Sequence, residues 1–300
     1  MLKAAIDIGT NTCRLLIGDE AGGTIRHLLV KRHITRLGGG FDKASGLSVA
    51  AIERTRAALA DFADEIRMAG VARTRAVATS AVRDAANGEA FCRMIEETTG
   101  IRLEVIGGEE EGMLTLRGAL AGLDDREGDF LVFDIGGGST EYTISRGESP
   151  VFAASLPLGV VRLMEGKHGL EEMREKIARE LAVLHRKLAG TAVSVDPEAT
   201  TLVATAGTAT TVAAIDLRLE TYDYRLVNNH VLSMERIREI FDLILPLPLA
   251  ERLRIPGLEK GREDLIVPGL LIMLATLESF GFDRLKVNDF GLLEGVFLSA

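Results

Sequence analysis

Short apolar runs alternate with longer stretches of helical periodicity along this chain. The N-terminal segment predicts three strands, at 2–8, 13–19 and 24–31, with Ala21-Gly22-Gly23 as a hairpin turn. Apolar positions then recur at helical spacing and predict a helix at 48–69, which ends just before Gly70. The rest of the first half predicts alternating strands and helices, at 75–79, 88–98, 102–106 and 109–121.

The same order of elements begins again at Phe130, with three more strands. The later part of the chain predicts helices at 169–188, 208–218, 234–245 and 262–279. It also predicts a strand at 202–205 and a closing strand and helix at 284–299. The polar run from Asp124 to Asp129 separates the two halves. We therefore predict two α/β domains, at 1–125 and 126–300, with the last helix able to pack back on the first domain.

The turn after the first predicted strand is repeated in the second half of the chain. Asp7-Ile8-Gly9-Thr10-Asn11-Thr12 recurs as Asp134-Ile135-Gly136-Gly137-Gly138-Ser139-Thr140. Glycines let the backbone approach an oxyanion, N–H and hydroxyl groups donate to it, and each Asp can hold a divalent cation or its waters. This doubled hairpin-and-crossover pattern is the layout of the actin-like, ribonuclease H-like superfamily. It predicts two domains with mixed sheets and an active-site cleft between them.

Three further segments are candidates to join these loops. Gly207-Thr208 lies between a strand and a helix, where free N–H groups suit an anion. Arg83 follows a strand and could hold phosphate oxygens, although a plain strand-to-helix connection explains this segment equally well. Glu109 and Glu110 are explained by the helix dipole, whereas Glu111 lies where a base could deprotonate an attacking water.

Arg14 and Glu141 occupy equivalent positions in the two copies and carry opposite charges. This difference favours Arg14 facing a substrate anion and Glu141 facing a metal or water, but either could be an exposed strand residue. The predicted metal ligands are Asp7, Asp134 and Glu141. The predicted phosphate-binding residues are loop or basic residues: Gly9, Thr10, Asn11, Thr12, Arg14, Arg83, Gly136, Gly137, Gly138, Ser139, Thr140, Gly207 and Thr208.

Composition narrows these possibilities. A net charge of −9 counts against a non-specific nucleic-acid binder but leaves room for a small polyanion that arrives with a metal ion. No apolar run is long enough for a membrane span, no signal peptide precedes the first strand, and two cysteines form no disulfide framework, which suits the cytoplasm. No Walker loop or HExxH occurs, so positioning, a metal and a carboxylate remain as the means of phosphoryl transfer.

Over nearly its whole length the chain resembles the Ppx/GppA family of exopolyphosphatases and guanosine pentaphosphate phosphohydrolases. Besides the two Asp-Ile-Gly loops, the segments that carry the resemblance are 78–83, 106–112 and 156–163. The resemblance implies cleavage of the terminal phosphate of polyphosphate or pppGpp with Mg²⁺, or with Mn²⁺ as the alternative. It also implies Glu111 as the catalytic base and a metal near Asp134 and Glu141. We further expect a homodimer.

The leading hypothesis is an exopolyphosphatase that releases one orthophosphate at a time. The alternatives are a pppGpp 5′-phosphohydrolase, a kinase or ATPase of the same superfamily, and a non-catalytic alarmone or phosphate sensor. The chain departs from the family pattern at Ala206, where a Gly is usual, and at Leu293, where an Arg is usual. It also ends at Ala300, which indicates the short form without a C-terminal helical domain.

Overall fold

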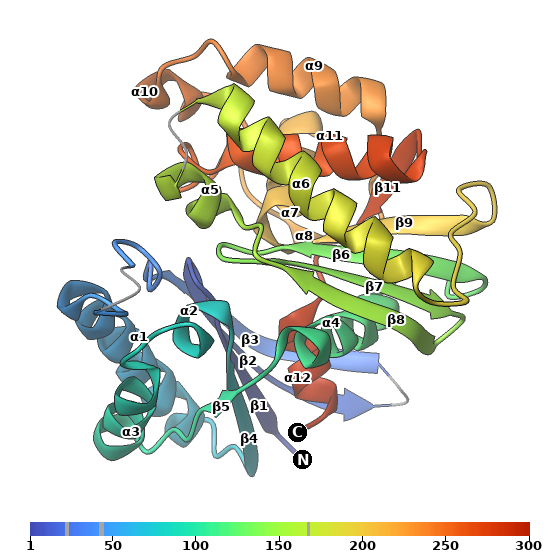
Figure 1. The fold of residues 1–300 in the computed structure, drawn as a ribbon. Helices are drawn as coiled ribbons and strands as arrows, with labels where there is room; N and C mark the ends of the chain where they lie inside the picture. Colours follow the sequence, from blue (N-terminus) through green and yellow to red (C-terminus); the bar gives the residue numbers. More distant parts are fainter. Residues whose placement is uncertain (22–23, 42–44, 167–168) are drawn as a thin grey trace. The chain divides into compact units, whose positions relative to one another are not determined.

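The computed structural model describes residues 1–21, 24–41, 45–166 and 169–300 (Figure 1). The backbone divides into two compact units. Unit 1 comprises Met1–Ala121 and Gly291–Ala300, and unit 2 comprises Gly122–Phe290. The division thus falls slightly before the sequence-based boundary, and the last helix belongs to unit 1. Gly22 and Gly23 of the expected hairpin turn lie outside the described residues.

Unit 1 contains a five-stranded sheet in the order β3-β2-β1-β4-β5. Strand β1 pairs antiparallel with β2 and parallel with β4, so the sheet is mixed. Its strands are β1 (Lys3–Ile8), β2 (Thr12–Ala21), β3 (Thr24–Ile34), β4 (Arg73–Ala78) and β5 (Glu104–Val105). Its helices are α1 (Val49–Met68), α2 (Ser80–Arg83), α3 (Gly88–Thr99), α4 (Gly108–Gly122) and α12 (Leu292–Leu298).

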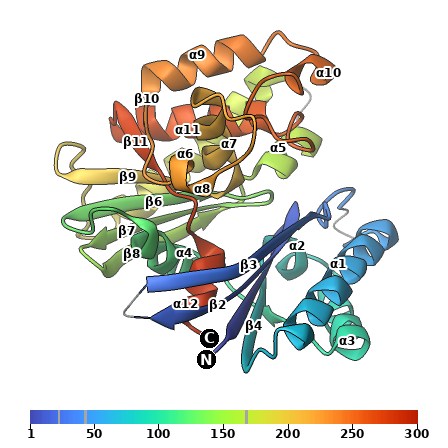
Figure 2. The same cartoon turned by 180° about the vertical axis from the view of Figure 1, so that it is seen from behind.

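Helices cover both faces of the unit 1 sheet. Helices α1 and α3 lie on one face, and α4 and α12 lie on the other (Figures 1 and 2). Ile6 and Ile8 of β1 join the core that includes Phe62 of α1 and Phe91 of α3. Because successive strand side chains point to opposite faces, Asp7 is directed toward the face covered by α4 and α12.

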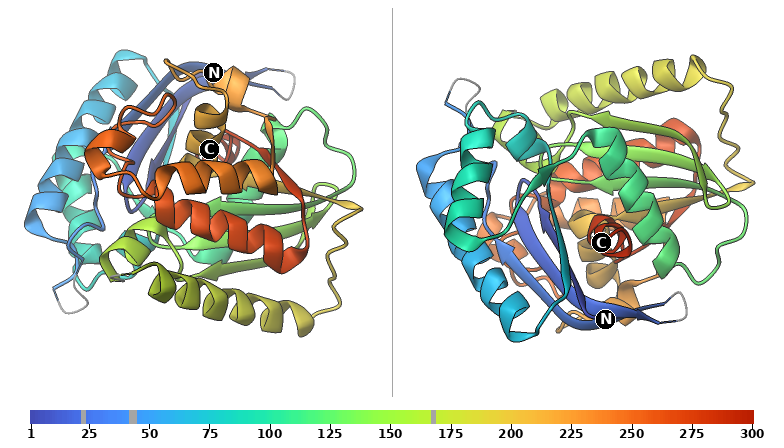
Figure 3. Two further views of the ribbon diagram at one scale, coloured as in Figure 1. Left: turned by 90° about the horizontal axis from the view of Figure 1, so that it is seen from above. Right: turned by 90° about the horizontal axis from the view of Figure 1, so that it is seen from below.

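Unit 2 contains a six-stranded mixed sheet in the order β10-β11-β9-β6-β7-β8. Its strands are β6 (Asp129–Ile135), β7 (Thr140–Arg146), β8 (Ser149–Leu156), β9 (Thr200–Thr205), β10 (Val231–Ser233) and β11 (Arg284–Val287). Its helices are α5 (Val160–Gly166), α6 (Leu170–Ala189), α7 (Ala206–Asp216), α8 (Tyr224–Val227), α9 (Met234–Ile244), α10 (Leu249–Arg252) and α11 (Ile266–Phe280). Helices α9 and α11 lie side by side on the side of the sheet that is seen from above (Figure 3, left). Alternate residues of β6, such as Leu131 and Phe133, join the core with these helices.

The two sheets repeat one arrangement. The order β3-β2-β1-β4-β5 in unit 1 corresponds to β8-β7-β6-β9-β11 in unit 2, where β10 is added at the edge. The prediction of two α/β domains with mixed sheets is therefore confirmed. In the described part of the chain, no helix has both the length and the apolar character needed to cross a bilayer.

Most long elements lie close to their expected positions, and the differences concern short ones. Of the strand expected at 102–106, only Glu104–Val105 pairs with the sheet. Four short helices, α2, α5, α8 and α10, and the strand β10 were not expected from the sequence. Of these, α2 contacts the first Asp-Ile-Gly loop and α5 contacts the second, each within its own unit.

Candidate active-site loops

The first Asp-Ile-Gly loop is a tight turn between β1 and β2. The N–H of Gly9 donates to the carbonyl of Thr12 at 2.9 Å, which closes the turn. The hydroxyls of Thr10 and Ser80 lie 3.1 Å apart, so the loop is tied to the first residue of α2. Because β1 and β4 are parallel neighbours, the loop and α2 follow the same edge of the sheet.

Asp7 forms an ion pair with Arg14 on the adjacent strand, where the two residues are in register. The Arg14 Nε and Nη2 atoms donate to the same oxygen, Asp7 Oδ2, at 3.0 and 2.7 Å. Oδ1 of Asp7 and Oδ1 of Asn11 are buried and have no hydrogen-bond partner among the described residues. The expected phosphate ligand Arg14 thus contacts the expected metal ligand Asp7, and two acceptor oxygens remain for water or a cation.

Glu111 differs from its two acidic neighbours in the first turn of α4. Glu109 and Glu110 are exposed, and Glu110 pairs with Arg75 at 3.1 Å. Glu111 is 8 % exposed, and its Oε2 lies 3.5 Å from Nη1 of Arg83. The same Arg83 nitrogen donates to the carbonyl of Ile106 at 2.9 Å, which fixes the guanidinium beside the start of α4. The structure thus brings two expected site residues together.

The second loop, between β6 and β7, repeats the geometry of the first. The N–H of Gly136 donates to the carbonyl of Ser139 at 3.0 Å. The Thr140 hydroxyl donates to the carbonyl of Leu158. The N–H groups of Gly137 and Gly138 have no hydrogen-bond partner in the described ranges. Free backbone donors in a glycine turn are what a phosphate oxygen requires.

The segment Leu158–Arg162 donates hydrogen bonds to the carbonyl groups of the second loop. The N–H groups of Val160 and Val161 donate to the carbonyls of Gly136 and Gly137 at 3.0 and 2.9 Å. Arg162 Nε donates to the carbonyl of Gly138 at 2.8 Å. A Cβ on Gly159 would lie 2.3 Å from the Gly137 carbonyl oxygen, so only glycine allows this approach. The sequence did not indicate this supporting role.

The third loop lies beside the second, because β9 and β6 are parallel neighbours with Thr205 opposite Asp134. It leads from Thr205 into α7. The guanidinium of Arg262 lies against Gly207, where a Cβ would come within 1.9 Å of Nη1. Arg262 also pairs with Glu259 at 3.1 Å. Arg262 is a further basic residue at the predicted phosphate loops, and sequence spacing alone did not reveal it.

Asp134 and Glu141 are the unit 2 counterparts of Asp7 and Arg14. They are in register on β6 and β7, and both are buried. Burial removes the alternative that Glu141 is an exposed strand residue. Ser155 donates to Oε1 of Glu141 at 2.7 Å, which orients the carboxylate.

The donor set fits Mg²⁺ better than a metal held entirely by protein. The described residues contain no cluster of three or more His, Cys, Asp or Glu side chains arranged to hold a metal ion. Mg²⁺ is commonly bound by one or two carboxylates together with substrate phosphates and waters. The in-register pair Asp134 and Glu141 provides oxygen donors of that kind.

Comparison with known proteins places this loop geometry in a family. The model of the Ppx/GppA phosphatase family matches residues 16–300. The chain belongs to the Ppx/GppA phosphatase family. It is 34 % identical to Exopolyphosphatase 2 of Mycobacterium tuberculosis, with 99 % of this chain and 97 % of that protein covered.

Solved structures of Ppx/GppA proteins agree with this assignment. The Aquifex aeolicus family member is 35 % identical, has a TM-score of 0.82, and is matched over 100 % of this chain and 97 % of its own. An exopolyphosphatase from Cytophaga hutchinsonii has a TM-score of 0.89 at 25 % identity, over 100 % of this chain and 97 % of its own.

The structure shows the local environment of the two departures from the Ppx/GppA pattern, Ala206 and Leu293. Ala206 has φ of +66°, in the left-handed region that favours glycine. Leu293 is buried in α12 at 1 % exposure, a position that suits an apolar side chain. The first departure therefore places backbone strain in the third predicted phosphate loop.

Proposed function

We propose that this protein is an exopolyphosphatase, a phosphoanhydride hydrolase that removes the terminal phosphate of inorganic polyphosphate. The observation that carries the proposal is the buried carboxylate of Glu111, which Arg83 holds at the start of α4. Membership of the Ppx/GppA family and similarity to a protein named Exopolyphosphatase 2 support the choice of substrate.

Each proposed role is assigned to a group within one unit. Glu111 accepts a proton from the attacking water, whose oxygen forms a bond to the terminal phosphorus. The bond between that phosphorus and the bridging oxygen breaks, and orthophosphate and the shortened chain leave. In unit 2, the backbone N–H groups of Gly137 and Gly138 are the proposed donors to phosphate oxygens.

Arg83 is a positioning residue in this proposal, because it contacts Glu111 and the Ile106 carbonyl at once. We assign Mg²⁺ binding to the two buried carboxylates of unit 2, Asp134 and Glu141. When bound, Mg²⁺ would neutralise phosphate charge and hold oxygens of the substrate. Mn²⁺ is the alternative ion.

Phosphate release from polyphosphate tests the assignment of Glu111. General-base assistance is typically worth about 10²- to 10⁴-fold in rate, so Glu111→Gln should lower kcat by that factor. Glu109→Gln is the matched control, because Glu109 is an exposed carboxylate in the same helical turn. Its kcat should equal that of the unaltered protein. Equal activity of both variants would refute the role of Glu111.

A side-by-side comparison of kcat/KM for polyphosphate and pppGpp decides between the two substrates of the family name. The proposal includes a homodimer, which analytical ultracentrifugation tests. It also includes a cytoplasmic location, a setting that suits the two free thiols, Cys13 and Cys92.

A further inference from the structure

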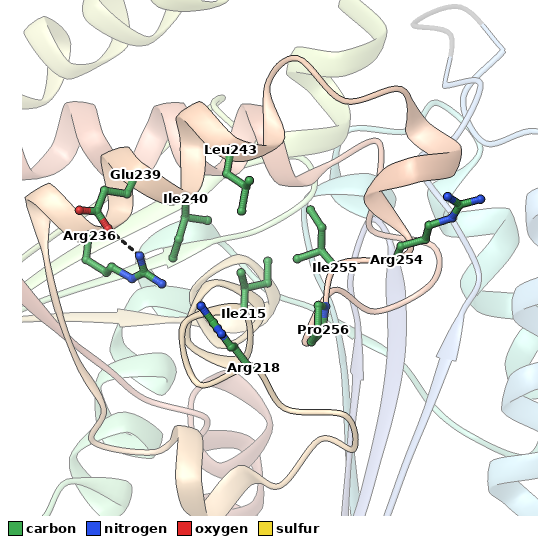
Figure 4. A pocket seen from close by; sticks show the side chains of 9 residues that line it. All are labelled: Ile215, Arg218, Arg236, Glu239, Ile240, Leu243, Arg254, Ile255 and Pro256. Atoms are coloured by element: carbon green, nitrogen blue, oxygen red, sulfur yellow. Dashed lines mark hydrogen bonds and ion pairs between the residues drawn. The ribbon is translucent and has the colours of Figure 1, made fainter.

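Unit 2 contains a cavity that is distinct from the phosphate loops (Figure 4). Helix α7 begins at Ala206 beside the third loop, and its other end, at Ile215, lines the cavity. The remaining lining comes from Arg218 just beyond α7, from α9 and from the segment that follows α10. The cavity volume is about 430 Å³, a size common for small-molecule sites.

Non-polar side chains form one part of the cavity wall. Ile215 and Ile240 provide its buried part, and Leu243, Ile255 and Pro256 complete it (Figure 4). Leu243 is 56 % exposed although it lines a concave site. A non-polar group placed here would remove this surface from water, which is favourable in proportion to the area covered.

Arg218 gives the cavity a positive charge. It follows the last residues of α7 with φ of +52°, and its N–H donates to the Ile215 carbonyl at 3.0 Å. Glycine is favoured at such a helix end, yet the chain has an arginine here. Its guanidinium has no hydrogen-bond or ion-pair partner among the residues that the structure describes.

Of the other two arginines in the lining, one is paired with carboxylates and the other points away from the cavity. Arg236 pairs with Asp216 and Glu239, each at 2.5 Å, so its charge is compensated. The side chain of Arg254 points away from the other lining residues in Figure 4. Arg218 is therefore the group available to an anionic ligand.

We propose that this cavity binds a small amphipathic anion, with a non-polar body against Ile240 and Leu243 and one carboxylate or phosphate group at Arg218. A free inorganic anion would leave the aliphatic walls uncovered. A cationic ligand would meet the charge of Arg218. Both requirements together define the ligand class.

Isothermal titration calorimetry with octanoate and octyl phosphate tests the proposal and distinguishes a carboxylate from a phosphate head group. Binding of at least one of them is expected, and the better ligand identifies the head group. Acetate, orthophosphate and octylammonium test the tail, the free anion and the charge separately, and none should bind as tightly.

Two variants and two matched controls locate the binding. Arg218→Gln should weaken binding about fivefold, as expected for an ion pair near solvent, and Leu243→Asp at least about tenfold. Arg179→Gln and Leu226→Asp alter an exposed arginine and an exposed leucine outside the cavity, and binding should be unchanged. Thermal melting verifies that each variant is folded.

The proposal is overturned if neither octyl anion binds, or if acetate, orthophosphate or octylammonium binds equally well. It is also overturned if Arg218→Gln binds like the unaltered protein, or if the control variants weaken binding as much. Calorimetry does not depend on phosphate release, so the result is independent of the proposed enzymatic function.

Discussion

Gly295→Ala should destabilise unit 1 and disturb the start of α4. Gly295 lies on α12, and a Cβ at this position would lie 1.8 Å from the carbonyl oxygen of Leu114 on α4. Since real Cβ contacts essentially never fall below 3.0 Å, the two helices must separate by at least 3.0 − 1.8 = 1.2 Å.

The free energy of unfolding should fall by roughly 1–2 kcal/mol. Overpacking of a tight contact costs about 1–3 kcal/mol. The better helix propensity of Ala offsets up to about 1 kcal/mol. Leu114 is one turn from Glu111 on the same helix, and a misplacement of about 1 Å can lower catalysis by about 10²-fold. We therefore expect a lower Tm and a kcat reduced tenfold or more.

Thermal melting and phosphate release from polyphosphate measure the two effects. Gly166→Ala is the matched control, because Gly166 also lies in a helix but its Cβ would meet no atom within 4 Å. That variant should be as stable as the unaltered protein, or more stable by about 0.5–1 kcal/mol. If the two variants have the same Tm and the same kcat, the reasoning from the close contact between α4 and α12 is refuted.

Other predictions concern single side chains. Ala206→Gly should raise the free energy of unfolding by about 0.5–1 kcal/mol. The change relieves left-handed backbone strain of about 1–2 kcal/mol, and the greater conformational entropy of glycine in the unfolded chain offsets only part of this gain. A lower Tm would contradict this. Burial raises the pKa of the Cys13 thiol to about 12, although a hydrogen bond with Thr35 opposes the shift. At pH 8 iodoacetamide should therefore label the half-buried Cys92 and leave Cys13 until the protein is denatured, as mass spectrometry would detect; equal labelling of the folded protein would refute it. Under the proposed function, Glu141→Gln should raise the Mg²⁺ concentration for half-maximal activity about tenfold or more, and an unchanged Mg²⁺ titration would remove Glu141 from the metal site.

The sequence predicted elements that carry a strong repeating pattern. The helix expected at 48–69 is Val49–Met68, because its apolar positions recur over five turns and Ser48 caps its start. The four residues of α2 and the seven of α5 complete barely one or two turns, so no periodicity distinguishes them from loops. Both were missed, although both contact the predicted phosphate loops.

Among the contacts within the loop clusters, some could also have been predicted from the sequence and others could not. The pairing of Asp7 with Arg14 could have been inferred, since both are equally far from the centre of a tight hairpin turn. The approach of Arg83 to Glu111 could not, because it depends on how the turn after β4 lies against the start of α4. The same holds for Arg262 beside Gly207, which are far apart in sequence.

The duplicated hairpins differ in charge more than in backbone geometry. Each turn is closed by one glycine N–H bond, at 2.9 Å from Gly9 and 3.0 Å from Gly136. The in-register residue opposite each Asp is Arg14 in one copy and Glu141 in the other. An Asp beside Arg is neutralised and attracts a cation weakly, whereas two neighbouring carboxylates repel each other until a cation is bound. The same fold element therefore favours a cation less in unit 1 than in unit 2, which is why our proposal assigns Mg²⁺ to Asp134 and Glu141.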